Sequence, residues 1–424
     1  MDIIIGAGVT GLSYANFTKN DYLIIEGENE PGGYCRTIKS SGFTWDYSGH
    51  FFHFKNEHIK NYIFERMEHQ EIFNVNKITS IYIKNTYIDF PFQKNIHQLP
   101  KDDFINCLVD LYEATKKDKK TNKYNSFKEM IYMNFGNTIC DLFLIPYNEK
   151  LYATSLDRLD SSAMGRFFPN ANFDDVIRNF RVADADSYNN SFVYPEGGAY
   201  EYIKALLKNI PREKIKLNEQ VIKINIENKT ITTSNGNTYH YSNLISTIPL
   251  NRFIDIADTN ITINKETLTC NKVRVFNIGF DRPSNLNEHW IYYPEKDIVF
   301  YRVGFYDNIM QSDRMSLYVE IGEKSDSTDE LAEEELLNRV LNDLKKVGVI
   351  NDHKYIDHCY IEMNPAYVHI NEQSESEKEK LFYHLETKNI YSLGRYGAWK
   401  YCSIEDNIIE AMNIANKINE EKHD

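Results

Sequence analysis

Three glycines near the start of the chain, Gly6, Gly8 and Gly11, restrict its fold more than any other feature. They follow a strand-like run at residues 2–5 and open a helical pattern, which predicts a buried strand, a tight turn and a helix. The first glycine permits the turn, the second lets backbone N–H groups approach a pyrophosphate, and the third lets the helix pack on the strand. A second apolar strand ends at Glu26, where a carboxylate can bind ribose hydroxyls. This order predicts a dinucleotide-binding unit.

The residues that follow Glu26 favour FAD over NAD as the dinucleotide. A glycine doublet, Gly32 and Gly33, and then Arg36 come shortly after this acid. The pattern resembles the glutathione-reductase-like FAD fold, and NAD-dependent dehydrogenases do not usually carry it. We therefore expect FAD as the cofactor, with the doublet and Arg36 beside it.

Gly49 and His50 lie in the aromatic stretch GFTWDYSGHFFHF at residues 42–54, and we expect them along the isoalloxazine ring. The alternative is that His50 and His53 are two partly buried histidines of an aromatic hairpin. The aromatic content of 13% leaves a similar choice for the whole chain, between a tyrosine-rich core and a cleft lined by rings.

The order of strand-like and helix-like segments predicts an α/β fold with three parts. These are a two-layer Rossmann-like FAD-binding domain, a helical insertion, and an antiparallel β-sheet domain beside the flavin. The first comprises residues 1–80, 190–260 and 385–424, the second 95–185, and the third 81–94 and 261–384. An NGN turn at 235–237 predicts a hairpin, and residues 327–348 predict a helix capped by Ser327 or Thr328.

Composition limits the partners and the compartment. A net charge of −14 argues against nucleic acid as a partner, because binding phosphates along a strand needs a basic surface. The six cysteines are scattered without metal-ligand spacing, so we expect free thiols in a reducing compartment and no metal site. No apolar run reaches the length of a membrane span, and the glycine motif begins at residue 6. These features predict a cytoplasmic protein without a membrane span or targeting peptide.

Several motifs, in a shared order along almost the whole chain, resemble the UDP-galactopyranose mutase family, and its eukaryotic-type branch more than the common bacterial type. Besides the N-terminal glycines, they are SGH (48–50), FPFQKNIHQLP (90–100), PYNEKLYA (146–153), YPEGGAYEYI (194–203), WIYYPEKDIVFYRVGF (290–305), NPAYVHI (364–370) and GRYGAWKY (394–401). The resemblance implies an isomerase that interconverts the pyranose and furanose forms of a nucleotide-diphosphate sugar. It also implies that FAD acts in its reduced form, through a covalent adduct between flavin N5 and the sugar.

The resemblance further implies roles for particular residues. A diphosphate leaving group suits arginine, whose fork binds phosphate oxygens bidentately. The residues expected at the diphosphate are Arg302, Arg395, Tyr292, Tyr367 and Tyr401. Phe90, Phe92 and Gln93 are expected at the uracil, and Tyr152, Arg166 and Asn189 at the sugar. Val221, Gly394 and Asn407 are expected at FAD, and His50, Arg302 and Arg395 are the expected catalytic residues. The tyrosines and phenylalanines have core packing as their alternative interpretation.

Two departures from the family pattern leave the sugar open. A family tryptophan falls on Tyr152, and a family arginine falls on Phe167, with Arg166 beside it. UDP-galactose is the default substrate, and UDP-arabinose, UDP-N-acetylgalactosamine and TDP-fucose are alternatives. NAD(P)H is a candidate reductant that would share the sugar-nucleotide cleft, and a homo-oligomer is expected. The main alternative function is a flavin oxidase of the amine-oxidase or protoporphyrinogen-oxidase kind on the same fold, and a third is a flavin-bound protein without catalysis.

Overall fold

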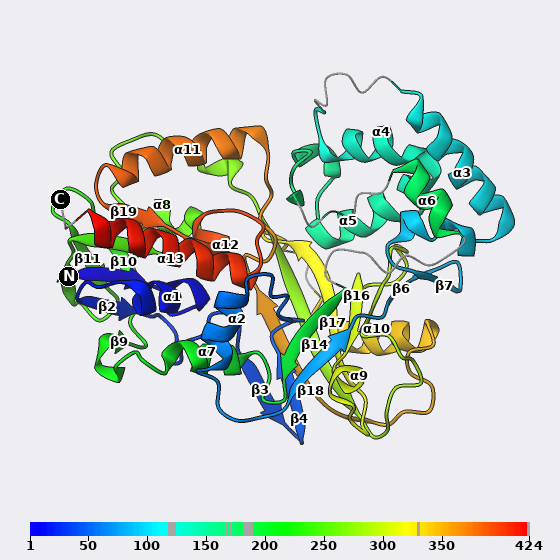
Figure 1. Ribbon diagram of the computed structural model, residues 1–424, viewed down its shortest axis with the longest axis horizontal. Helices are drawn as coiled ribbons and strands as arrows, with labels where there is room; N and C mark the ends of the chain where they lie inside the picture. The colour runs from blue at the N-terminus through cyan, green and yellow to red at the C-terminus, as the bar shows by residue number, and fades with distance from the viewer. Residues whose placement is uncertain (118–123, 166–167, 169–171, 181–189, 329–330, 422–424) are drawn as a thin grey trace.

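The structure is a computed structural model, which describes residues 1–117, 124–165, 168, 172–180, 190–328 and 331–421. Its nucleotide-binding domain is built on a parallel sheet of order β19-β13-β1-β2-β9. The strands are β1 (Asp2–Ile5), β2 (Tyr22–Ile25), β9 (Ile215–Lys216), β13 (Asn243–Ser246) and β19 (Ile390–Ser392). Segments far apart in the sequence therefore form one sheet. The first strand of the chain and its last described residues both lie on this domain (Figure 1).

This domain has three layers rather than the two predicted. One face of the sheet is covered by α1 (Val9–Phe17), α2 (Glu57–Phe64), α7 (Tyr200–Leu207) and α13 (Ile404–Glu420). The other face packs on β10 (Val221–Asn225), β11 (Thr230–Thr233), β12 (Thr238–His240), α8 (Leu250–Ile256) and α11 (Glu372–Glu386). A parallel sheet needs cover on both faces, and the three short strands supply part of it. The predicted NGN hairpin is β11–β12 of this third layer.

A second, seven-stranded sheet has the order β18-β14-β17-β16-β15-β6-β7. Its strands are β6 (Thr79–Ile83), β7 (Thr86–Asp89), β14 (Asn271–Phe280), β15 (Trp290–Tyr292), β16 (Arg302–Phe305), β17 (Ser316–Lys324) and β18 (Tyr355–Met363). All neighbours are antiparallel except β6 and β15, which run parallel and correct the expectation of a wholly antiparallel sheet. Two small ribbons, β3 (Thr37–Ser40) with β4 (Phe43–Asp46) and β5 (Ile72–Asn76) with β8 (Ser191–Pro195), join this sheet to the nucleotide-binding domain.

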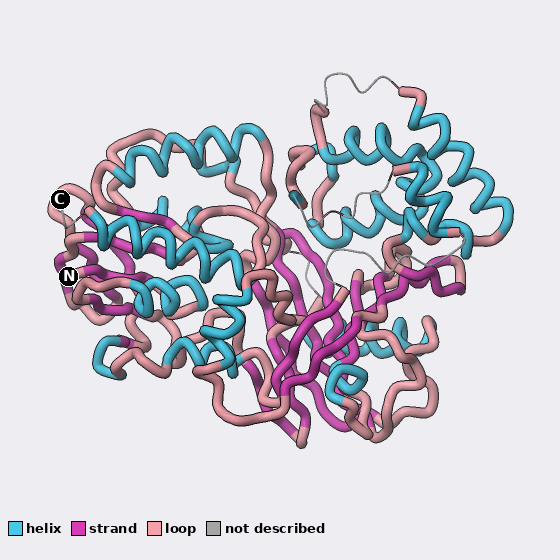
Figure 2. Tube along the Cα trace, viewed as in Figure 1, coloured by secondary structure: helices cyan, strands magenta, loops and turns pink. Residues whose placement is uncertain are grey.

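The helical insertion stands over one end of the large sheet (Figure 2). Its helices are α3 (Lys101–Thr115), α4 (Phe127–Ile139), α5 (Ile145–Tyr152) and α6 (Phe173–Asn179), with a π-helical stretch at Cys140–Leu144. Two short helices, α9 (Tyr306–Met310) and α12 (Gly394–Gly397), follow strands β16 and β19. Because α5 packs against β17, the insertion contributes residues to the space above the sheet.

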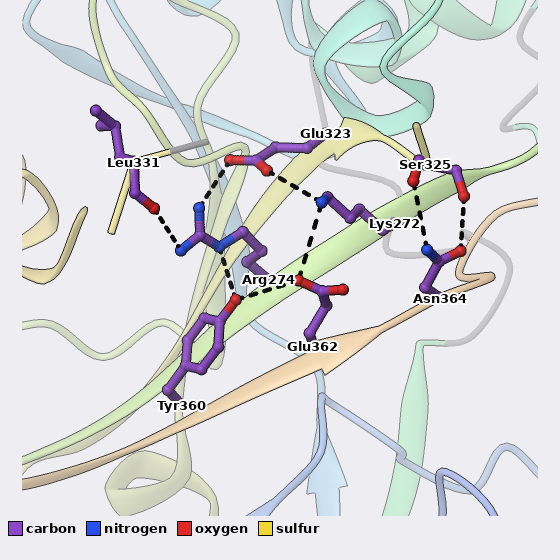
Figure 3. Close-up of polar contacts among 8 residues, drawn as sticks. All are labelled: Lys272, Arg274, Glu323, Ser325, Leu331, Tyr360, Glu362 and Asn364. Carbon is purple, nitrogen blue, oxygen red and sulfur yellow. Dashed lines mark hydrogen bonds and ion pairs between the residues drawn. The ribbon is translucent and has the colours of Figure 1, made fainter. Parts of the chain in front are cut away.

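The outer face of the large sheet is covered by α10 (Glu333–Lys346), through Leu336, Val340 and Leu344. Where this apolar layer ends, charged side chains replace it (Figure 3). Arg274 is only 3% exposed, and its guanidinium lies 3.4 Å from the Glu323 carboxylate.

The helix predicted at 327–348 corresponds to α10. This helix begins at Glu333, so the predicted caps at Ser327 and Thr328 are wrong. Within the described residues, no helix is both long enough and apolar enough to cross a membrane.

Candidate active site

A cavity of about 760 Å³ lies where the nucleotide-binding domain, the large sheet and the helical insertion meet. At one end it is lined by the glycine-rich turn of Gly6 and Gly8 and by Glu26. At the other end it is lined by Tyr147 of the insertion and by Arg302 of the sheet. One continuous space therefore joins the predicted cofactor and substrate regions.

The glycine-rich end fits a dinucleotide. Gly6 has φ +100°, a conformation that favours glycine, and a Cβ on Gly11 would clash with the Gly6 carbonyl oxygen. Gly33 has φ +58°, which also favours glycine, and its backbone lies beside that of Gly8 on the cavity wall. Within the part of the chain that the structure describes, no side chain caps the N-terminus of α1 at Gly8, which leaves its first N–H groups available to a pyrophosphate.

Glu26 lies at the rim of this end of the cavity. One carboxylate oxygen accepts a hydrogen bond from the Ala7 N–H at 2.7 Å, and the other accepts one from the Glu28 N–H at 2.9 Å. These bonds orient the carboxylate while leaving acceptor capacity for ribose hydroxyls. The residues of this end therefore fit the adenosine half of a dinucleotide cofactor.

His50 also lines the cavity, near enough to Arg395 and Arg302 for their charges to act on it. Burial and the charge of Arg395 lower its pKa to about 4, so the imidazole is neutral at neutral pH. The His50 N–H donates to the carbonyl of Ser48 at 2.7 Å, and the Ser48 hydroxyl donates to the Glu320 carboxylate. Ser48 thus links the backbone of His50 to the Glu320 carboxylate on β17 through two hydrogen bonds.

Arg302 and Glu320 form an ion pair across neighbouring strands β16 and β17. The guanidinium donates to the carboxylate through both Nε and Nη2, the second bond at 2.8 Å. Glu320 is 1% exposed, so this is a buried charge pair. Its carboxylate compensates the guanidinium in a region from which water is largely excluded.

Arg395 has a different environment, made of rings and carbonyls. Its guanidinium carbon lies 4.6 Å from the ring centre of Tyr401 and 5.2 Å from that of Tyr367. The guanidinium also donates long hydrogen bonds to the carbonyls of Cys402 at 3.3 Å and Ala366 at 3.5 Å. Among the described residues, no carboxylate forms an ion pair with it. Arg395 therefore brings to the cavity a guanidinium that no carboxylate of the described residues pairs with, and that can bind an anion.

The structure brings many of the sequence-predicted site residues to the cavity wall. These are Gly6, Gly8, Glu26, Gly32, Gly33, Gly49, His50, Phe90, Val221, Tyr292, Arg302, Tyr367, Gly394, Arg395, Tyr401 and Asn407. Five others do not line it: Gly11, Arg36, Phe92, Gln93 and Tyr152. Arg166 and Asn189 lie outside the described residues.

The five residues away from the wall have contacts that explain their positions. Gly11 packs behind the turn, and Arg36 donates to the Glu30 carbonyl at 2.8 Å instead of facing the cavity. Phe92 and Gln93 are fully buried, with the ring of Phe92 stacked on that of Phe143, and Tyr152 packs edge-on against Tyr367. From the positions that they hold, these five residues can support the cavity wall but do not contact a ligand in the cavity.

Several lining residues were not predicted. Tyr147 and Asn148 belong to the motif PYNEKLYA, and Tyr301 belongs to WIYYPEKDIVFYRVGF, so both motifs already pointed to these positions. Lys77 had no such signal, because it lies between motifs. Its ammonium lies 5.2 Å from the ring centre of Phe90, and burial lowers its pKa to about 8.

Comparison with solved structures shows the same fold in several flavoproteins. A reduced UDP-galactopyranose mutase superimposes with a TM-score of 0.90 at 23% identity, covering 98% of this chain and 95% of that one. A putative protoporphyrinogen oxidase from an Exiguobacterium species gives 0.77 at 15% identity, with 99% and 98% covered. Cyclohexylamine oxidase from Brevibacterium oxydans gives 0.72 at 12% identity, with 100% and 99% covered. The family model described as flavin containing amine oxidoreductase matches residues 12–419, and the chain belongs to that family.

Proposed function

We propose that this protein is an FAD-dependent mutase that interconverts the pyranose and furanose forms of a UDP-sugar, with UDP-galactose as the default substrate. The observation that carries the proposal is that two guanidiniums line the cavity, those of Arg302 and Arg395, with tyrosine rings beside both. The charges of both also act on His50, so the two groups converge on one region. Fixed cations beside the flavin region suit a diphosphate that must leave and return.

The residues of this chain would bind, orient and enclose the substrate. Arg395 and the hydroxyl of Tyr401 would hold the diphosphate, and the ring of Phe90 would stack on the base. Neutral His50 presents backbone and ring groups beside the cofactor without adding charge. The aromatic wall, which includes the partly buried ring of Tyr292, would limit access of water to the reacting sugar.

FAD fits the glycine-rich end described above, and in its reduced form it supplies the nucleophile that ring isomerisation requires. The likeness to a reduced UDP-galactopyranose mutase supports this choice over other flavin chemistry. Membership of the eukaryotic-type branch, reduction by NAD(P)H and homo-oligomerisation remain predictions of the sequence.

The second candidate is a flavin oxidase, which the family membership and the likeness to cyclohexylamine oxidase favour. An oxidase of apolar amines has no use for two arginines at the substrate end of its cavity. In an oxidase, Arg395 would have a role only if the substrate were itself an anion.

The deciding experiment incubates the protein, reduced with dithionite, with separate UDP- and TDP-sugars and follows the products by chromatography and by NMR of the anomeric protons. We expect a furanose product from one sugar, formed only while the flavin is reduced. The oxidised protein is the matched control. Absence of isomerisation from every sugar, together with reduction of the oxidised flavin by an amine and its reoxidation by O2, would establish the oxidase instead.

A further inference from the structure

Lys150 extends from α5 into a ring of backbone carbonyl oxygens. Its ammonium donates to the carbonyls of Tyr293 at 2.8 Å, Glu295 at 3.0 Å, Ile298 at 2.8 Å and Phe300 at 2.5 Å. All four belong to residues 293–301, the connection between β15 and β16. One side chain of the helical insertion thus bonds four times to one loop of the sheet.

The ring of carbonyls requires the charged form of this lysine. An ammonium has three N–H donors that four carbonyls can share, whereas a neutral amine has two and would leave carbonyls unsatisfied. Burial lowers the pKa of Lys150 to about 7, and the carboxylates of Asp343, Asp297 and Glu295 act in the opposite direction. A buried group that satisfies several buried acceptors is costly to remove.

Both partners of this contact carry residues of the candidate active site. On α5, Tyr147, Asn148 and Leu151 line the cavity. The loop that receives Lys150 begins after Tyr292 and ends at Arg302, two residues that also line the cavity. The ring centre of Tyr147 lies 5.1 Å from that of Tyr292, so the two parts of the wall are in contact. Lys150 therefore lies behind the wall and connects its helical half to its arginine-bearing half.

The C-terminal end of α5 has further anchors, all on other elements. The Asn271 side chain donates to the carbonyl of Leu151 at 2.6 Å, and His369 Nε2 donates to that of Tyr152 at 2.9 Å. A Cβ on Gly322 would clash with the carbonyl oxygen of Lys150, so the helix lies directly on β17. These contacts hold α5 near the sheet, and Lys150 sets its position relative to the β15–β16 loop.

We propose that Lys150 is a positioning residue, which holds α5 and the β15–β16 loop in register so that Tyr147 and Asn148 keep their places beside Tyr292 and Arg302 at the substrate end of the cavity. The inference that this register governs nucleotide-sugar binding rests on the proposed function. Lys150 itself contacts neither cofactor nor substrate.

The test uses the FAD-bound protein and two variants, Lys150→Met, which keeps most of the side-chain stem, and Lys150→Ala. Hydrogen exchange of the amides of residues 145–152 reports the position of α5 without any ligand, and titration with UDP reports the site. n-Propylammonium, which replaces the missing part of the lysine, is added to the alanine variant, with propanol and sodium chloride as controls. Lys128→Met, which removes an α4 lysine paired with Asp157 at 3.0 Å, is the matched control variant.

We expect faster exchange confined to α5 in both Lys150 variants and a UDP Kd raised about tenfold or more, because small misplacements of site residues have large effects. FAD content should be unchanged, and n-propylammonium should restore both readouts in the alanine variant. Unchanged exchange, unchanged UDP affinity, or faster exchange throughout the chain with loss of FAD and no restoration would each overturn the proposal. If the unmodified protein fails to bind UDP, the proposed function is wrong, while the exchange data still decide whether Lys150 holds α5.

Discussion

Replacement of Arg395 by alanine tests the assignment of the diphosphate site most directly. Arg395 lies among tyrosine rings, and its contacts to carbonyls at 3.3 and 3.5 Å are long, so most of its five N–H donors are available to a ligand. Because its backbone N–H, not its side chain, donates to Asn407 at 2.9 Å, the substitution keeps the local backbone contact. We therefore expect a folded variant that retains flavin.

The expected loss follows from the hydrogen bonds that a guanidinium makes to phosphate. A charge-assisted bond contributes about 1.5–3 kcal/mol, and two parallel bonds less the cost of desolvation give about 3 kcal/mol. At 1.4 kcal/mol for each factor of ten, the Kd for UDP should rise about 140-fold. Arg395→Lys, which keeps the charge and loses the fork, should give an intermediate value.

The assay is isothermal titration of the oxidised FAD-bound protein with UDP and, separately, with uridine. Uridine lacks the phosphates, so its affinity should be the same in Arg395→Ala and in the unmodified protein. Lys400→Met is the control, since it removes the same charge from the same segment where Lys400 pairs with Glu410 at 2.6 Å outside the cavity. A Kd for UDP within threefold of the unmodified protein in Arg395→Ala, or an equal loss of uridine binding, would refute the reasoning.

Three further outcomes follow from the structure. Gly11→Ala should cost about 1–3 kcal/mol by overpacking against the Gly6 carbonyl and lower the flavin bound per chain, measured by absorbance; full flavin content would contradict the packing. The pKa of His289 is lowered by burial to about 4, and its Nδ1 accepts from the Ile78 N–H, so below pH 6.5 the unfolded chain binds a proton that the native protein does not. The free energy of unfolding should then fall as the pH falls from about 6.5 toward 4. In denaturant titrations this loss should be about 2 kcal/mol larger at pH 5 in the unmodified protein than in His289→Asn, and equal losses in the two proteins would exclude this account. The Tyr152 hydroxyl is buried without a hydrogen-bond partner among the described residues, so Tyr152→Phe should leave the Tm unchanged or raised; a lowered Tm would reveal a partner.

The nucleotide-binding end could be predicted from the sequence because its determinants are local. Gly6, Gly8 and Glu26 act through turns and strand ends that a few neighbouring residues specify. The third layer of the domain was missed because the strands from 221 to 240 are short and partly polar, so their packing against the parallel sheet leaves little pattern. The start of α10 was placed too early because Ser327 and Thr328 have the side chains of helix caps and precede a charged run, whereas α10 begins at Glu333.

The substrate end was less accessible to sequence reasoning because distant segments form it together. The PYNEKLYA motif was recognised, but Tyr152 was chosen from it, whereas Tyr147 and Asn148 line the cavity. The orientation of α5 depends on Lys150 and on Asn271, whose partners lie more than a hundred residues away. Helical periodicity alone cannot supply that information.

The two arginines illustrate why charge at a site must be counted with its counter-charges. The sequence motifs make Arg302 and Arg395 equivalent, as two cations beside a flavin. In the fold, Glu320 lies opposite Arg302 on the neighbouring strand and accepts two of its hydrogen bonds, because a buried guanidinium without an anion would be unfavourable. An incoming diphosphate must compete with that carboxylate at Arg302, whereas at Arg395 it meets rings and weakly bonded carbonyls. For this reason the loss of ligand affinity should be larger at Arg395, and the loss of stability larger at Arg302, whose removal leaves the Glu320 charge uncompensated.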